Sequence, residues 1–453
     1  MMILRRKIYD QLLKWKKETQ GEKAILIEGA RRIGKSTIVQ EFAKKEYDSY
    51  ILIDFSKKDQ EVENYFYKYL NDLTTFFMML QIHFNVQLVT RKSVIIFDEV
   101  QMFPQARAAI KFLVADGRFD YIETGSLISI KENVKNIVIP SEERHISMYP
   151  LDFEEFCWAM HENMLIDYIK DCFHKQEALD RSLHNKAMLL FKEYMLVGGM
   201  PMPVIKFIGN DQNFFICDQE KRDILSLYRQ DIMKINTQYR DKVLLIFDQI
   251  PGFLSSHEKR IVFDQLKKGQ RALQYQETFF WLADSMIANE CFSCNDPQVG
   301  LSLNEDRTYI KCYMGDTGLL VSHAFDENAL MEEGVYKNIL AGKLSINQGM
   351  LYENVIAQML VANGHKLYFY THYDEVTHHN DIEIDFLLSG KSRVSYSIFP
   401  IEVKSGKNYT TKSLQKFCDK YDKRIGAAYI IHPRNFMIKD GVICLPPYMT
   451  FLL

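Results

Sequence analysis

Residues 29–36 place the strongest constraint on what this chain folds into. They read Gly-Ala-Arg-Arg-Ile-Gly-Lys-Ser and fit the pattern G-x-x-x-x-G-K-[ST], in which backbone N–H groups wrap a phosphate chain. The apolar run 24–28 predicts a buried strand before this loop, and apolar residues at helical spacing over 36–47 predict a helix after it. A strand, a glycine-containing loop and a helix in this order favour a nucleotide-binding domain over a chance glycine turn.

The residue types in the loop suit phosphate chemistry. Gly29 and Gly34 allow the backbone to approach the phosphates closely. Lys35 would reach the β- and γ-phosphates, and the Ser36 hydroxyl would ligate Mg²⁺.

A second motif ends another predicted strand. Apolar residues 94–97 run into Asp98 and Glu99, the pattern in which a buried strand delivers one carboxylate to Mg²⁺ and the next to the attacking water. The next predicted strand ends in hydroxyls, so Thr124 or Ser126 could act as a polar sensor, although a glycine turn explains them equally well. The residues predicted to bind ATP are Gly29, Ala30, Arg31, Arg32, Ile33, Gly34, Lys35, Ser36, Thr37, Asp98 and Thr124, with Mg²⁺ on Ser36 and Asp98 and with Glu99 as the catalytic base.

Length and composition exclude several classes of protein. A chain of 453 residues is too long for one core, so several domains are expected. The net charge of −3 gives no global basic signature, and no apolar run approaches the roughly 18 residues of a membrane helix. The basic amphipathic stretch 1–17 favours a surface helix over membrane contact. Eight scattered cysteines indicate reduced thiols, so we expect a cytoplasmic protein without a membrane partner.

A further set of charged residues lies near the C-terminus. Period-two alternation puts Glu402 and Lys404 on one face of a predicted strand, and Asp385 would meet them if its own strand forms a hairpin with theirs. Glu353, on a predicted helix, would add a third carboxylate. In a metal nuclease, Asp385 and Glu402 would hold Mg²⁺ and Lys404 would orient and deprotonate a water.

Two alternatives stay open in this region. The same charges fit an amphipathic hairpin whose charged side is solvated. His372, His378 and His379 between the predicted strands could bind a metal, but a solvated loop is the favoured interpretation.

These motifs together resemble the prokaryotic AAA+ family ATPases whose conserved C-terminal region resembles a PD-(D/E)XK nuclease. The resemblance rests on residues 29–36, 97–99, 124–126, 149–156, 198–201 and 316–320. It implies an α/β protein with a P-loop AAA+ ATPase parallel sheet over 1–150, a helical lid over 151–229, a winged-helix-like domain over 230–330 and a PD-(D/E)XK-like α/β domain over 331–453.

Within the middle of the chain, helices are predicted over 243–254, 260–266 and 271–289, followed by β-like segments. A winged helix of this kind binds DNA in some proteins and mediates protein contacts in others. The basic residues that favour DNA are Lys267, Lys268, Arg271 and Lys311.

The family resemblance also implies a homo-oligomer in which an arginine of one subunit completes a neighbour's site. Arg107, Arg118 and Arg144 are candidates, and Arg144 is favoured because it precedes the 149–156 segment. Two positions depart from the family pattern: Glu143 replaces a glycine, and Leu127 replaces the last serine of the sensor strand.

The sequence therefore predicts Mg²⁺-dependent ATP hydrolysis coupled to a DNA-directed, nuclease-like C-terminal domain. The alternative is a nucleotide-gated regulatory or scaffold protein whose C-terminal domain binds a partner without cutting it.

Overall fold

The structure is a computed structural model, and it describes residues 2–126, 139–235, 237–256, 259–261, 275–325, 333–340, 347–376, 378–391, 396–406 and 408–453. It divides into two compact units, Met1–Tyr149 with Asp284–Met286, and Pro150–Ala283 with Ile287–Leu453. The finer division of the second unit into a lid, a winged-helix-like domain and a nuclease-like domain stays a proposal.

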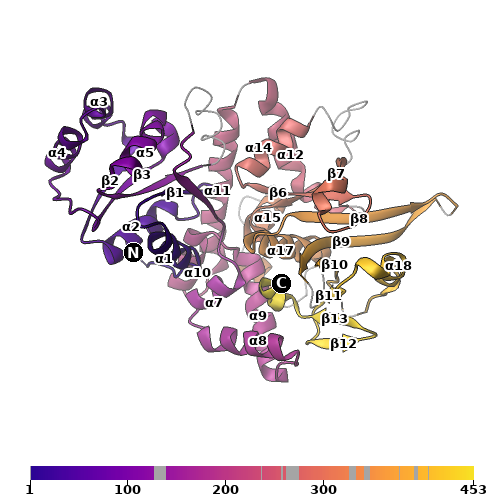
Figure 1. The fold of residues 1–453 in the computed structure, drawn as a ribbon. Helices are drawn as coiled ribbons and strands as arrows, with labels where there is room; N and C mark the ends of the chain where they lie inside the picture. The colour runs from indigo at the N-terminus through magenta and orange to yellow at the C-terminus, as the bar shows by residue number, and fades with distance from the viewer. Residues whose placement is uncertain are drawn as a thin grey trace. The chain divides into compact units, whose positions relative to one another are not determined.

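The first unit is built on a five-stranded sheet whose paired strands are all parallel (Figure 1). The strand order is β2-β3-β4-β1-β5. The strands are β1 (Ala24–Gly29), β2 (Ser49–Asp54), β3 (Ser93–Asp98), β4 (Asp120–Gly125) and β5 (Glu143–Met148). β1, β3 and β4 are buried along their whole length, as expected for strands covered on both faces. The α/β fold with a parallel sheet predicted from the sequence is confirmed.

Helices cover this sheet and carry most of its aromatic core. They are α1 (Ile8–Thr19), α2 (Lys35–Glu46), α3 (Gln60–Tyr69), α4 (Leu73–Phe84) and α5 (Pro104–Asp116). The basic amphipathic stretch at the N-terminus forms α1, which buries Ile8, Leu12 and Trp15. The apolar side of α1 is therefore packed inside the protein rather than exposed for membrane contact.

Residues 60–84 form two helices, α3 and α4, rather than one continuous helix. The helix breaks before Asp72, whose carboxylate accepts a hydrogen bond from the Thr75 N–H (3.3 Å) and caps α4. The break lets both helices face one core, because the rings of Phe66 and Phe76 meet edge to face with centroids 5.0 Å apart.

The second unit combines many helices with one mixed sheet. Its helices are α7 (Phe153–Ala159), α8 (Asn163–Lys175), α9 (Arg181–Val197), α10 (Pro201–Gly209), α11 (Phe214–Met233), α12 (Thr237–Ser255), α14 (Gln276–Asp284), α15 (Thr317–Ala324), α16 (Glu333–Leu340), α17 (Gln348–Ala362) and α18 (Lys412–Lys420). Its strands are β6 (Ala288–Cys294), β7 (Glu305–Met314), β8 (Leu367–Asp374), β9 (His379–Lys391), β10 (Tyr396–Val403), β11 (Tyr429–Ile431), β12 (Met437–Lys439) and β13 (Val442–Leu445).

All eight of these strands belong to one sheet in the order β12-β13-β11-β10-β9-β8-β6-β7 (Figure 1). β6 and β7 form the antiparallel hairpin that the sequence assigned to a winged-helix-like domain, yet β6 also pairs in parallel with β8. The hairpin is therefore an edge of the C-terminal sheet. Of the three predicted helices, α12 contains 243–254 and α14 lies within 271–289, while residues 262–266 lie outside the described residues.

A buried ionic group joins three helices of the second unit. Asp218 of α11 accepts hydrogen bonds from Ser322 of α15 (2.6 Å) and Tyr336 of α16 (2.7 Å). Arg222 donates to Asp218 (2.8 Å) and to the Phe325 carbonyl (3.2 Å). Arg222 thus fixes the end of α15 onto α11.

The segments 198–201 and 316–320 carry part of the family resemblance, and the structure brings them together. Asp316 accepts hydrogen bonds from the Gly199 N–H and from the Leu319 N–H, the second of which caps α15 (2.9 Å). A Cβ on Gly318 would lie 2.3 Å from the Val197 carbonyl oxygen. Close backbone packing around one buried carboxylate therefore holds the two glycine-containing segments together.

We predict that Gly318→Ala destabilises the protein by about 1–3 kcal/mol, because the new methyl group meets backbone that cannot move aside. Chemical denaturation measures the effect. The matched control is Gly209→Ala in α10, where a Cβ meets nothing within 4 Å and helix propensity favours alanine. Equal stability of the two variants would contradict the packing argument.

In the described part of the chain, no helix is both long enough and apolar enough to cross a bilayer. The eight cysteines all lie in described segments and are free thiols, as the sequence predicted. Cys291 and Cys294, the C-x-x-C pair, are both buried in β6.

Candidate functional site

The phosphate-binding pattern forms the turn between β1 and α2. Gly34 adopts a left-handed conformation (φ 92°), as does Arg32 (φ 71°), and this lets the chain reverse before the helix begins at Lys35. At Gly29 a Cβ would lie 2.4 Å from the Met148 carbonyl oxygen, so only glycine fits between β1 and the end of β5. The conformation places successive N–H groups and the α2 N-terminus around one point.

Lys35 is turned back onto its own loop. Its ammonium group is buried and donates hydrogen bonds to the carbonyls of Gly29 and Ala30, both at 3.0 Å. Burial lowers the pKa of Lys35, and the negative charges of Glu99 and Asp98 oppose that shift. Because two neutral carbonyls compensate a buried cation weakly, a phosphate is the better partner for this group.

Ser36, Asp98 and Thr124 form a connected polar group at the carboxyl ends of β3 and β4. The Ser36 hydroxyl donates to Asp98 Oδ1 (2.8 Å), and the Thr124 hydroxyl donates to the same oxygen. Hydroxyl and carboxylate oxygens are ligands that Mg²⁺ prefers, so Ser36 and Asp98 fit the role predicted for them. A bound Mg²⁺ would neutralise phosphate charge at this position.

Glu99 follows Asp98 in a left-handed conformation (φ 54°), which is uncommon for a non-glycine residue. Its N–H donates to Thr124 Oγ1 (3.3 Å), and its carboxylate accepts a hydrogen bond from Gln101. The sequence did not indicate this contact, since no motif marks a glutamine two residues after Glu99. Of the two predicted sensor hydroxyls, Thr124 is the one bonded to this group.

The three arginines proposed to act on a neighbouring subunit lie in different environments. Arg107 is buried, and its guanidinium makes two hydrogen bonds to Glu143 (3.1 and 2.8 Å), so it cannot reach another chain. Arg118 pairs with Asp116 of its own chain. Arg144 is partly exposed beside Glu18 (2.9 Å), and its action in trans stays a prediction.

The Arg107–Glu143 pair explains why Glu143 can replace the glycine of the family pattern. Glu143 lies in β5 with both carboxylate oxygens bonded to Arg107, so its buried charge is compensated. His145, two residues further on the same strand, contacts Glu143 (3.2 Å) and Glu28 (3.4 Å). Hydrogen bonds to these carboxylates raise the pKa of His145 to about 9.

This shift predicts that stability depends on pH. The pKa of His145 is higher folded than the 6.5 expected unfolded, so its stabilisation is complete below about pH 6.5 and is lost as pH rises through about 9. The ring is nearly half exposed, so solvent screening reduces the effect to about 1 kcal/mol. Denaturation midpoints measured from pH 6 to pH 10 should show this loss in the wild type and not in His145→Gln; parallel curves would contradict it.

The predicted C-terminal residues also come together, within the second unit. β9 and β10 are antiparallel, and the Val403 N–H donates to Asp385 Oδ2 (2.8 Å). Lys404 Nζ lies 3.0 Å from Glu402 Oε2, on the strand face that period-two alternation predicted. Glu353 of α17 is almost fully buried nearby. The hairpin that the sequence required for this cluster is therefore present.

Two lysines that were not predicted here contact Glu353. Lys311 of β7 donates to Glu353 Oε1 (3.1 Å), and Lys259 donates to Oε2. The Tyr313 hydroxyl donates to Oε1 as well. Lys311 is one of the four basic residues that the sequence suggested for DNA binding. It is buried and directed at this carboxylate, so it is not available to DNA. The other three, Lys267, Lys268 and Arg271, lie outside the described residues.

These contacts set the protonation of the cluster. Burial would raise the pKa of Glu353, but Lys311 and Lys259 lower it to about 2. Burial and the charge of Glu353 raise the pKa of Asp385, and burial raises that of Glu402. Among the described residues, no group of three or more His, Cys, Asp or Glu side chains is arranged to hold a metal ion.

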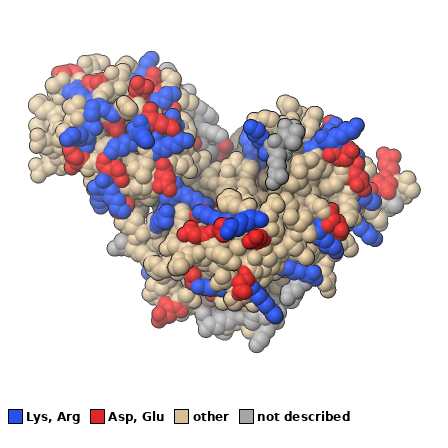
Figure 2. All heavy atoms as spheres, turned by 60° about the horizontal axis from the view of Figure 1, so that its bottom comes forward, with Lys and Arg blue, Asp and Glu red and all other residues tan. Residues whose placement is uncertain are grey.

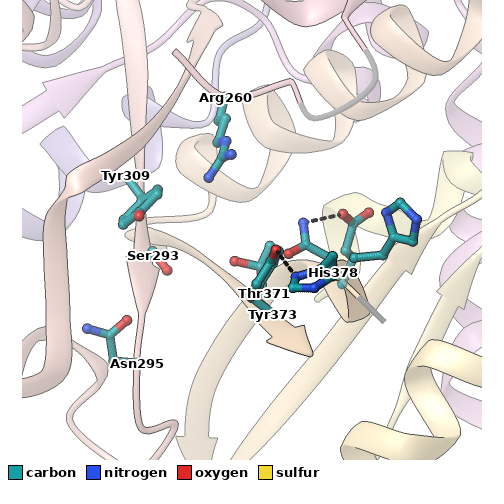
Figure 3. A pocket seen from close by; sticks show the side chains of 10 residues that line it. Arg260, Ser293, Asn295, Tyr309, Thr371, Tyr373 and His378 are labelled. Carbon is teal, nitrogen blue, oxygen red and sulfur yellow. Dashed lines mark hydrogen bonds between the residues drawn. The ribbon is translucent and has the colours of Figure 1, made fainter. Parts of the chain in front are cut away.

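A cavity of about 710 Å³ lies on the same face of the sheet (Figure 3). Tyr309 and Arg260 line one side of it, and Tyr373 and His378 line the other. Tyr309 precedes Lys311 by two residues on β7, so the two side chains share a strand face with the carboxylate cluster. The histidines lie in and beside the β8–β9 hairpin, and their contacts include Tyr373 and Asp381.

Three family models match separate parts of the chain. Residues 21–157 match an AAA domain, residues 188–329 match a domain of unknown function (DUF8612), and residues 348–448 match another domain of unknown function (DUF4143). No curated protein matches the chain. The parallel sheet, the phosphate-binding loop and the first match together define an AAA-type nucleotide-binding domain at the N-terminus, of the class whose members are generally ATPases.

Proposed function

We propose that the chain hydrolyses ATP in a Mg²⁺-dependent reaction at the loop between β1 and α2. The observation that carries this proposal is the hydrogen-bonded group of Ser36, Asp98 and Thr124 beside the Lys35 loop. Lys35 would bind the phosphates, and Ser36 and Asp98 would hold Mg²⁺. Glu99, held by its own backbone conformation and by Gln101, would orient the attacking water.

Glu99→Gln tests the base. We expect ATP binding to be kept and turnover to fall by about 100-fold or more, because a positioned general base is lost while the phosphate contacts remain. Single-turnover hydrolysis with Mg²⁺ measures the rate, and fluorescent-nucleotide titration measures the affinity. Wild-type turnover in this variant would show that Glu99 is not the base.

Lys35→Ala tests the binding loop. ATP affinity should fall by about 10- to 100-fold, since a charge-assisted hydrogen bond to phosphate is lost. The matched control is Lys45→Ala on the same helix, where the lysine pairs with Glu41 at the surface. Equal affinity of the two variants would rule out the phosphate-binding role.

For the C-terminal domain, the two functions left open by the sequence differ in whether nucleic acid is cut. Coupled cleavage of DNA needs a metal on Asp385 and Glu402, with Glu353 beside them. We propose instead that this domain binds a partner without cutting it, because lysines already compensate the Glu353 carboxylate. The lining of the adjacent cavity, with an arginine and two tyrosines, supports binding of a planar or anionic group there.

DNA as the partner, a homo-oligomeric state and a cytoplasmic location stay proposals. On the face drawn in Figure 2, basic and acidic side chains are interspersed, and that face shows no extended basic field. A DNA contact would therefore depend on a local group of cations rather than on the overall surface charge.

Incubation of the wild-type protein with plasmid and linear DNA, with Mg²⁺ or Mn²⁺ and with or without ATP, tests the absence of cleavage. We expect intact DNA under every condition while ATP is hydrolysed. Glu402→Ala is the matched control, since it removes a nuclease carboxylate and should leave ATP hydrolysis unchanged. Cleavage that disappears in Glu402→Ala would restore the nuclease function.

A further inference from the structure

The C-terminal carboxylate cluster does not fit a divalent cation in the way that a nuclease requires. Three carboxylates, Glu353, Asp385 and Glu402, approach one another inside the second unit, and three lysines face them. The formal charges therefore cancel without a metal. A dication would leave two excess positive charges in a buried place, which is costly.

The lysine contacts also use the atoms that a metal would need. Glu353 is only 1% exposed, and each of its oxygens accepts from an ammonium group, Oε1 from Lys311 and Oε2 from Lys259. Lys311 Nζ also lies 3.9 Å from Asp385 Oδ1. One ammonium group thus sits between carboxylates of α17 and β9, the position in which a bridging cation would lie.

A third observation concerns Glu402. This side chain is 1% exposed, and Lys404 Nζ lies 3.0 Å from Oε2. Neither carboxylate oxygen has a hydrogen-bond partner of good geometry among the described groups. Buried carboxylate oxygens normally have a partner. Glu402 therefore keeps an unused acceptor beside a cluster whose other carboxylates are occupied.

We propose that Lys259 and Lys311 take the place of a divalent cation in this cluster, so that the wild-type protein binds no metal there and removal of Lys259 opens a Mg²⁺ or Mn²⁺ site. Lys311 lies on β7, and Lys259 lies in the short described segment 259–261. This inference rests on the proposal that the domain does not cut. Lys259 is the accessible member of the pair, at 23% exposure against 8% for Lys311.

The test titrates Mn²⁺ into the nucleotide-free full chain and follows free Mn²⁺ by electron paramagnetic resonance. All variants carry Asp98→Ala, which removes the contribution of the nucleotide site. We expect no bound Mn²⁺ with Lys259 present, and one Mn²⁺ per chain with submillimolar affinity in Lys259→Ala. Adding Glu353→Gln to Lys259→Ala should weaken this binding at least tenfold.

Lys170→Ala is the matched control. It removes a partly exposed lysine from a buried glutamate, Glu154, as Lys259→Ala does from Glu353. Asp385 and Glu402, which would share the metal with Glu353, are not part of the Glu154 pair. Both variants should unfold at a temperature several degrees lower. Mn²⁺ should restore the midpoint of Lys259→Ala and leave that of Lys170→Ala unchanged.

Lys259→Met provides a second variant of similar length should the alanine variant fail to fold, and it should bind Mn²⁺ in the same way. A folded Lys259 variant without Mn²⁺ binding would overturn the inference, as would equally tight binding by the protein that keeps Lys259. Failure of the variants to bind, with intact DNA in the cleavage assay, would overturn only this inference. DNA cleavage by the wild type would overturn the proposed function itself.

Discussion

Ion pairs between buried charges hold together several of the helices and strands on which the rest of this structure depends. Arg107 of α5 meets Glu143 of β5, and Glu353 of α17 meets Lys311 of β7 and Lys259. Asp218 and Arg222 form a further pair within α11. A buried charge without a partner is far more costly than an exposed one, so the pairs between elements fix which elements pack together. Lys35 differs from these pairs, because its buried ammonium group donates hydrogen bonds to neutral carbonyls at the proposed nucleotide site.

This contrast separates structural from functional charges. A pair such as Arg107 and Glu143 is complete within its own unit, so substitution there affects stability. The positive charge of Lys35 is not neutralised in this way, because its hydrogen bonds go to carbonyls of its own loop. An anionic ligand can therefore form an ion pair with it. The carboxylates near Glu353 resemble a functional site in the sequence, yet lysines of the same unit already lie beside Glu353 and Glu402.

Sequence reasoning succeeded where the chemistry is contiguous. The loop 29–36 was predictable because β1, one turn and α2 are contiguous in the sequence. The acidic pair at 98–99 was predictable because the apolar residues of β3 lead directly into it. The meeting of Asp385 and Glu402 was also predictable, since both lie on strands that are adjacent in the sequence.

The contacts that sequence reasoning missed join distant residues. Lys259 lies 94 residues before its partner Glu353, and Lys311 lies 42 residues before it. A lysine carries no signal that tells an internal counter-ion from a surface charge.

The sharing of one sheet by the β6–β7 hairpin and the later strands has a consequence for how the chain is synthesised. The hairpin leaves the ribosome well before β8, its parallel neighbour, because α15, α16 and α17 lie between them. During that interval the β6 edge has unpaired backbone groups that another nascent chain could pair with. Slow translation between residues 315 and 367 would prolong that exposure, so the order of synthesis, and not only the final contacts, bears on how much native protein is obtained.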